Sequence, residues 1–165
     1  MLVFDSSTLI LLANCELLDV FLNSAKGVVY IPKAVESECM AKKSFDALLI
    51  EKRINERKIM VIQVTNRALC EKLRGDFGLG AGEAEAIALG IEKKALVATD
   101  DKNAINACKL LNLRFATAIG FLVRAFEKRL LAKQEALSKL AELSKYGRYS
   151  RKIIADAEES ITKSR

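Results

Sequence analysis

The chain has 165 residues, of which 51% are hydrophobic, and this is enough for one domain with a full core. It contains no histidine, which excludes His-based triads, His-based acid catalysis and most zinc or iron sites. Any bound metal must therefore be held by oxygen ligands.

The sequence also predicts where the protein resides. Its four cysteines are far apart and form no CxxC motif, which favours reduced thiols over disulfides and zinc. The chain starts on a strand-like run without a secretion signal, and no segment reaches the roughly 18 apolar residues of a membrane span. We expect a cytoplasmic protein with no membrane partner.

Positive charge is concentrated toward the C-terminus. The net charge is +6, and residues 121–165 carry 11 Lys and Arg against 6 Asp and Glu, whereas residues 1–120 carry 16 against 15. This pattern indicates either attraction to a polyanion or a solvated helical face, and charge alone does not separate the two.

Strand-like and helix-like segments alternate along the chain. Short apolar runs predict strands at residues 2–4, 28–31, 60–64, 95–98 and 113–117. Helical spacing predicts helices at 8–21, 33–43, 45–58, 83–92 and 102–111, another from Thr65 or Asn66 to Leu73, and mostly helix from Ile119, broken at Gly147. The alternation predicts an α/β fold with a parallel sheet flanked by helices.

Two of the predicted strands end in acidic residues. Asp5 follows the first strand, and Thr99, Asp100 and Asp101 follow the strand at residues 95–98. Ligand sites in open α/β folds lie beyond the carboxyl ends of the strands, so these acids are candidates for one site. The alternative role for Asp5 is a helix N-cap, and one of Asp100 and Asp101 could equally cap the helix that follows.

Helical geometry ranks the glutamates of two predicted helices, those at residues 33–43 and 83–92. Glu38 lies on the apolar face of its predicted helix, whereas Glu36 is rotated away from that face. Glu83 stacks with apolar residues and lies in the first turn, where the helix dipole favours a carboxylate, while Glu85 faces nearly the opposite direction. We therefore favour Glu38 and Glu83, with Glu85 as the alternate.

Four carboxylates gathered in one site repel each other unless they are protonated or bridged by a cation. Mg²⁺ and Mn²⁺ prefer carboxylate ligands and keep several waters, one of which can attack a phosphodiester. Each acid taken alone has a simpler explanation as a solvated or capping carboxylate, but this explanation weakens when all four sites are considered together.

Four segments in this order carry a family resemblance: DSSTLI at 5–10, PKAVESE at 32–38, GEAEAIALG at 82–90 and LVATDDK at 96–102. The chain resembles the PIN-domain ribonucleases, including the VapC-type toxins. The resemblance implies a parallel-stranded, three-layer PIN-like domain over residues 1–120. Residues 121–165 would then form a basic helical C-terminal extension packed on the domain or on a partner.

The resemblance also assigns roles to residues of this chain. It places the catalytic and metal-binding acids at Asp5, Glu38, Glu83 and Asp101, and we keep Asp100 and Glu85 as alternates. Ser7 and Thr99 match the supporting polar residues of the first and last motifs.

The function implied by this resemblance is Mg²⁺- or Mn²⁺-dependent endonucleolytic cleavage of single-stranded RNA, with the toxin of a toxin–antitoxin pair as one form of it. The implied partners are RNA, an antitoxin protein and a second copy in a homodimer. The alternative is a non-catalytic PIN-like module that binds nucleic acid or protein. Two weaker interpretations are a dinucleotide site at the glycine-rich residues 78–84, which no strand precedes, and a receiver domain, which would need paired acids after the first strand.

The C-terminal segment combines two patterns. A leucine stripe predicts a packed helical face, formed by Leu130, Leu131, Leu137, Leu140 and Leu143. Aromatic residues among cations suit RNA contacts, and these are Tyr146, Arg148, Tyr149, Arg151 and Lys152. We favour packing as the main role, because the stripe is the longer of the two patterns.

Overall fold

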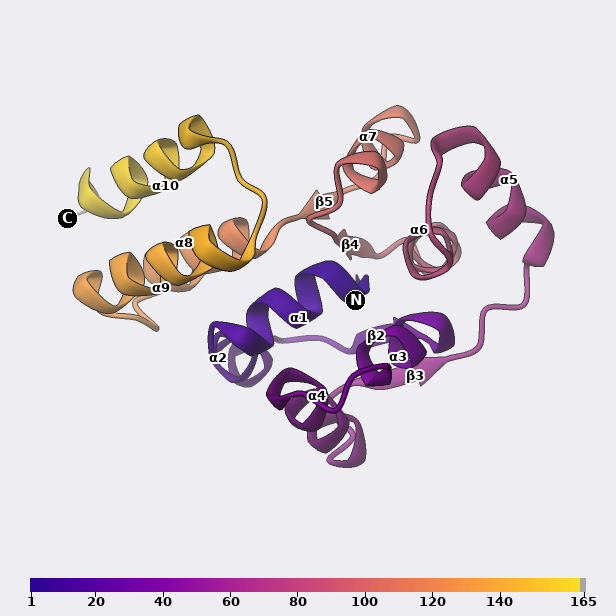
Figure 1. Cartoon of the computed structure of the whole chain (residues 1–165), viewed down its shortest axis with the longest axis horizontal. Coiled ribbons are helices and arrows are strands. Elements are labelled where there is room, and N and C mark those ends of the chain that lie inside the picture. Colours follow the sequence, from indigo (N-terminus) through magenta and orange to yellow (C-terminus); the bar gives the residue numbers. More distant parts are fainter. Residues whose placement is uncertain (164–165) are drawn as a thin grey trace.

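The computed structural model describes residues 1–163, which form a five-stranded sheet covered by helices (Figure 1). The strands are β1 (Leu2–Phe4), β2 (Val29–Pro32), β3 (Met60–Ile62), β4 (Leu96–Ala98) and β5 (Phe115–Ala116). Every pairing is parallel and the strand order is β3-β2-β1-β4-β5, with β1 in the centre. The predicted α/β fold with a parallel sheet is confirmed.

Helices fill the connections between these strands and the C-terminal part of the chain. They are α1 (Ser6–Asn14), α2 (Leu18–Ser24), α3 (Lys33–Met40), α4 (Phe45–Asn55), α5 (Arg67–Phe77), α6 (Ala81–Lys93), α7 (Lys102–Leu110), α8 (Ala118–Glu127), α9 (Lys133–Tyr146) and α10 (Arg151–Lys163). The segment 8–21, which the apolar spacing predicts as one helix, is instead divided between α1 and α2. The division lies at Glu16, whose φ of 54° ends the first helix.

The sheet separates two apolar cores, as expected of a three-layer arrangement. Successive strand residues point to opposite faces, so that Phe4 packs with α1, α2, α4 and α8–α10, whereas Val3 packs with α5, α6 and α7. The strands are apolar on both faces because both faces are covered. In Figure 1, α5, α6 and α7 lie on one side of the strands and the remaining long helices lie on the other.

The C-terminal helices belong to the first of these cores. Leu140 and Leu143 of α9 and Ile161 of α10 are buried in the same apolar cluster as Phe4. An ion pair of 2.9 Å between Lys139 of α9 and Glu16 joins the extension to the corner between α1 and α2. Four residues of the leucine stripe, Leu131, Leu137, Leu140 and Leu143, therefore pack in this core, whereas Leu130 is exposed. A division of the chain at residue 120 stays a prediction.

Two further predictions about the chain can be compared with the structure. All four cysteines are free and buried, with Cys39 and Cys108 on opposite sides of the sheet. Within residues 1–163, no single helix is long and apolar enough to cross a membrane; α1 and α2 reach that length and composition only together, and they are bent by 107°.

Candidate active site

Asp5 lies directly after the central strand β1 and is completely buried. Its Oδ1 accepts hydrogen bonds from the backbone N–H of Thr8 at 3.0 Å and from the Ser7 hydroxyl at 2.8 Å. Its Oδ2 accepts from the hydroxyls of Ser7 and Thr99. Asp5 is thus the N-cap of α1, and it is also connected to the end of β4 through Thr99.

The electrostatic surroundings of Asp5 disfavour its ionised form. Burial raises its pKa from 3.8 to about 7, although the hydrogen bonds from Thr99, Thr8 and Ser7 lower it, and the charge of Asp100 raises it further. A buried carboxyl with this pKa gains from any nearby cation, because a positive charge stabilises the carboxylate.

The loop after β4 brings a second carboxylate to the same edge of the sheet. Asp101 is the N-cap of α7 and accepts from the Ala104 N–H at 2.8 Å. The N–H of Asp101 donates to Oγ1 of Thr99 at 3.2 Å, and Thr99 in turn donates to Asp5. One threonine therefore connects the two aspartates, and the capping role predicted for one of Asp100 and Asp101 belongs to Asp101.

Glu38 reaches this edge from α3 and bridges two other helices. Its Oε2 accepts from the Ser6 hydroxyl at 2.6 Å and its Oε1 accepts from the N–H of Gly82 at 2.9 Å. A Cβ atom at Gly82 would lie 2.7 Å from Cδ of Glu38. The absence of a side chain at Gly82 leaves room for Glu38 in this position at the start of α6. Glu38 is exposed at the rim of the site while Glu36 is half-buried, so the expectation that Glu38 is the inward-facing glutamate of this helix is wrong.

Glu83 lies in the first turn of α6 and is half-buried. Burial raises the pKa of its carboxyl, and the charges of Asp101 and Glu38 raise it further. The carboxylates of Asp101 and Glu38 thus lie close enough to Glu83 to disfavour its ionised form. The fourth, Asp5, is connected to them through Thr99 and Asp101. We refer to Asp5, Glu38, Glu83 and Asp101 as the acid cluster.

The two alternate acids have protein partners of their own. Glu85 is buried, pairs with Arg67 at 2.6 Å and accepts from the N–H of Ala34 at 3.2 Å, in the first turn of α3. Asp100 accepts from the hydroxyls of Thr8 and Tyr149, each at 2.6 Å. It also accepts from the N–H of Ala118, at the start of α8, at 2.8 Å. Both alternates therefore have structural partners that account for their positions.

The acid cluster suits a hard divalent cation by its chemistry. All of its donors are carboxylate oxygens, and within residues 1–163 none of the four carboxylates is paired with a Lys or Arg. No three acidic or cysteine side chains of the described chain form a ready-made ligand set. Mg²⁺ is typically bound through one or two carboxylates and several waters, so the residues present fit such an ion.

The aromatic and basic residues near the C-terminus differ in their surroundings. Tyr146, Arg148, Arg151 and Lys152 are exposed. Tyr149 is half-buried and donates its hydroxyl to Asp100. Tyr149 thus has a protein contact next to the acid cluster that its sequence neighbourhood did not indicate.

Two other contributors to the site were missed by sequence reasoning. Ser6 lies between two residues that were identified, and Gly82 directly precedes Glu83, but nothing in the local pattern indicated that both would hold Glu38. The only sequence signal for these two residues was their place in the segments DSSTLI and GEAEAIALG, which carry the family resemblance.

These acids, their order in the chain and the fold that carries them can be compared with known proteins. A family model described as a PIN domain matches residues 1–162. PIN domains are generally nucleases and typically use divalent metals. No protein of curated function matches the chain. Since the match spans almost the whole sequence, the chain belongs to the PIN-domain family.

Proposed function

We propose that this PIN-domain protein is an endoribonuclease that hydrolyses phosphodiester bonds of single-stranded RNA with Mg²⁺ or Mn²⁺. The observation that carries the proposal is the acid cluster at the carboxyl edge of the sheet, in which burial raises the pKa of Asp5, and burial together with the charges of Asp101 and Glu38 raises the pKa of Glu83. Burial and like charges disfavour the ionised form of these carboxylates, and a divalent cation bound between them would stabilise it.

Each member of the acid cluster has a separate task in this proposal. Asp5 and Asp101 come from strand ends, and Glu38 and Glu83 come from helices that meet at Gly82, so the four would hold a cation between β1, β4, α3 and α6. When bound, the cation would supply a nucleophilic water and neutralise charge on the phosphate.

The residues around the acids would keep the site organised. Ser7 and Thr99 hold both oxygens of Asp5 in place, so that the carboxylate needs little reorganisation when a phosphate arrives. The Ser6 hydroxyl holds Oε2 of Glu38, while the N–H of Gly82 holds Oε1. We include in the proposal a VapC-like role in the cytoplasm, with an antitoxin partner and a homodimer.

A cleavage assay with matched controls tests this function. The purified protein would be incubated with single-stranded RNA, double-stranded RNA and single-stranded DNA in Mn²⁺, in Mg²⁺ and in EDTA. We expect internal cleavage of single-stranded RNA with either metal, no cleavage in EDTA, and loss of cleavage in Asp5→Asn. Equal cleavage by the wild type and Asp5→Asn, or cleavage that survives EDTA, would indicate a contaminant.

Absence of cleavage in every condition would favour the non-catalytic nucleic-acid-binding module instead. The variant Glu85→Gln serves as the matched control, since it removes an acid of the same helix α6 that pairs with Arg67 outside the acid cluster. It should retain metal-dependent cleavage provided that it is assayed below its melting temperature.

A further inference from the structure

The connection between α9 and α10 is attached to the edge of the acid cluster by one side chain. Tyr149 donates its hydroxyl to Oδ1 of Asp100 at 2.6 Å, while Oδ2 of the same carboxylate accepts from Thr8 and from the N–H of Ala118. Burial and the charge of Asp100 raise the pKa of Tyr149 far above its usual value. The phenol therefore stays protonated and remains a donor.

The contact at Asp100 continues directly into the proposed active site. The N–H of Asp100 donates to Oγ of Ser7 at 3.2 Å, and Ser7 donates to both oxygens of Asp5. The charge of Asp100 also raises the pKa of Asp5, which shows that the two carboxylates are electrostatically coupled. Tyr149 is thus separated from Asp5 by only two intervening residues.

The backbone of the connection is shaped to accept the tyrosine ring. A Cβ atom at Gly147 would lie 2.8 Å from Cδ2 and 2.9 Å from Cζ of Tyr149, so the ring packs directly against the glycine backbone. In Figure 1 this connection runs beside the junction of β5 and α8, where Ala118 contacts the same aspartate. The ring is fixed at one face by Gly147 and at its tip by Asp100.

The same connection presents three cations to solvent. Arg148, Arg151 and Lys152 are exposed, and within residues 1–163 none of them takes part in an ion pair. Some cations of the chain form ion pairs, as Arg53 does with Asp19 and Lys139 with Glu16, whereas others, such as Arg57 and Lys94, form none within residues 1–163. The three cations of this connection differ from those others in their position, because they flank Tyr149, which contacts Asp100 next to the acid cluster.

We propose that residues 147–152, which we call the basic turn, bind backbone phosphates of the single-stranded RNA substrate, with Tyr149 as the positioning residue that holds the turn beside the acid cluster. This inference rests on the proposed function. A polyanion approaching four carboxylates is repelled by them, and cations next to the site offset that repulsion and raise the local concentration of substrate. The basic turn supplies these charges, and Tyr149 fixes where they are placed.

The direct test is RNA binding measured without metal. Fluorescence anisotropy with a labelled single-stranded RNA, in EDTA and over a range of salt concentrations, would compare the wild type with the triple variant Arg148→Gln, Arg151→Gln and Lys152→Gln. Each lost phosphate contact lowers the log–log salt slope by about 0.7 for a single strand, so three contacts lower it by about 2 and weaken binding roughly 100-fold at 0.1 M salt.

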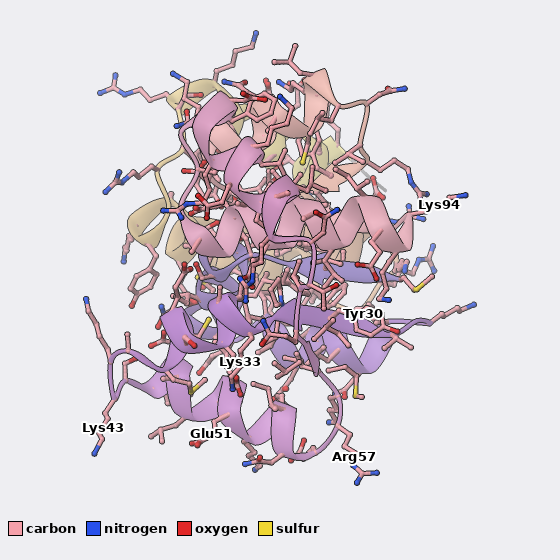
Figure 2. All side chains as sticks on the ribbon, turned by 90° about the vertical axis from the view of Figure 1, so that its right-hand side faces the viewer. Tyr30, Lys33, Lys43, Glu51, Arg57 and Lys94 are labelled. Atoms are coloured by element: carbon pink, nitrogen blue, oxygen red, sulfur yellow. The ribbon has the colours of Figure 1, made fainter. Side chains whose placement is uncertain are left out.

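A charge-matched triple variant separates local binding from a general effect of net charge. Lys26, Arg57 and Lys94 precede β2, β3 and β4, so they lie at the edge of the sheet opposite the acids. In Figure 2, Arg57 and Lys94 point outward on the side away from Lys43. Their replacement by Gln should leave the salt slope within about 0.5 of the wild-type value. An equal loss in both triple variants would overturn the inference.

The positioning role of Tyr149 is tested with Tyr149→Phe, which removes only the hydroxyl. We expect KM for RNA cleavage to rise about 5-fold to 10-fold with kcat nearly unchanged, because the cations remain but are no longer held in place. Tyr30→Phe, the same change in β2, should alter neither constant. An unchanged KM in Tyr149→Phe, or a fall in kcat alone, would overturn the positioning role.

These experiments test the proposed cleavage activity and the proposed RNA binding by the basic turn separately. A protein that binds RNA through the basic turn in EDTA, but never cleaves it, would contradict the proposed function and leave the binding inference standing. A protein that cleaves RNA with metal, but whose triple variant binds RNA as tightly as the wild type, would overturn the basic turn alone.

Discussion

Asp5 combines two tasks that sequence patterns treat as alternatives. Its Oδ1 caps α1 through Thr8, and its Oδ2 accepts from Thr99 at the end of the neighbouring strand. Both tasks follow from the position of Asp5, because a residue directly after a strand and directly before a helix is close to both. The same dual use occurs at Asp101, which caps α7.

The first prediction concerns the stability of Asp5→Asn. The folded-state pKa of Asp5 is raised to about 7, so the native protein keeps a proton that the unfolded chain releases near its ordinary value of 3.8. The native state therefore binds more protons between these pH values, and stability falls as pH rises from about 4 to about 7. Asparagine cannot ionise, and its oxygen can still cap Thr8.

The measurement is the melting temperature as a function of pH, in EDTA. At pH 8 we expect Asp5→Asn to melt at least about 3 °C above the wild type, which corresponds to roughly 1 kcal/mol in a domain of this size. At pH 4 the difference should largely vanish. A variant that melts below the wild type at pH 8 would contradict the assignment of this pKa.

The second prediction distinguishes the two glutamates of α6. Glu83→Gln relieves repulsion from Asp101 and Glu38, so in EDTA at pH 8 its free energy of unfolding should equal or exceed that of the wild type, while metal-dependent cleavage is lost. Glu85→Gln weakens the pairing of the buried Glu85 with the exposed Arg67 and should cost about 1 kcal/mol while cleavage is retained. Denaturant unfolding and a cleavage assay on both variants check this prediction. Retained cleavage in Glu83→Gln together with lost cleavage in Glu85→Gln would refute it.

At the scale of elements, the site depends on how closely α3 and α6 approach. The N–H of Gly82 is one of the free donors of the first turn of α6, and Glu38 of α3 accepts from it. The absence of a side chain at Gly82 is what allows this contact. The helix dipole of α6 adds to the attraction for carboxylates at this end.

The third prediction tests this approach with two glycine substitutions. Gly82→Ala should push Glu38 out of its position and reduce metal-dependent cleavage at least about 10-fold, while the gain of about 0.5–1 kcal/mol in helix propensity offsets the lost hydrogen bond. Gly75→Ala, in α5 with no atom within 4 Å of an added Cβ, should stabilise by a similar amount and leave cleavage unchanged. Full activity in Gly82→Ala would show that Glu38 is dispensable.

The elements themselves could largely be predicted from local patterns, with three informative exceptions. One is the break between α8 and α9, where Arg129 has a φ of 58°, because the segment from Ile119 was predicted to be helical as far as Gly147. Apolar runs identified all five strands, because strands buried on both faces are apolar throughout. The break at Glu16 was missed, because no glycine or proline marks it. The helix that was expected to end near Leu73 continues to Phe77, because Gly75 is tolerated inside α5 and Gly78, with a φ of 64°, ends the helix instead.

At the scale of the whole molecule, the helices after β5 are part of the main core. Leu143 is fully buried in the same cluster as Phe4, although the two are separated by most of the chain. Packing of this kind couples the stability of the extension to that of the sheet. It also keeps the basic turn in a fixed place relative to the acid cluster.

The fourth prediction follows from this shared core. Leu143→Ala should lower the free energy of unfolding by about 2–5 kcal/mol, and the whole protein should still unfold in a single transition. Circular dichroism and denaturant titration check the result. The exposed Leu110→Ala serves as control and should change stability by less than about 0.5 kcal/mol. Two separate transitions in Leu143→Ala would show that the extension is an independent unit.

The candidate site was only partly accessible from the sequence for a related reason. The candidate acids were predicted from strand ends and helix faces, although Glu38 is exposed and Glu85 is more buried than Glu83. Ser7 and Thr99, the partners of Asp5, were predicted as supporting residues, but the contacts of Ser6 with Glu38 and of Tyr149 with Asp100 were not, since they form only after the helices pack. Such contacts join residues far apart in the chain, and no local pattern encodes them.

The central claim, that the acid cluster holds a divalent cation, is tested most directly by a Mn²⁺ titration followed by the melting temperature. At about 100 times the dissociation constant, binding stabilises the native state by about 2.7 kcal/mol, a rise of roughly 5–10 °C for a domain of this size. We expect this rise in the wild type and in Glu85→Gln, and its loss in Asp5→Asn and Glu83→Gln. An equal rise in all four proteins, or none in the wild type, would contradict the account.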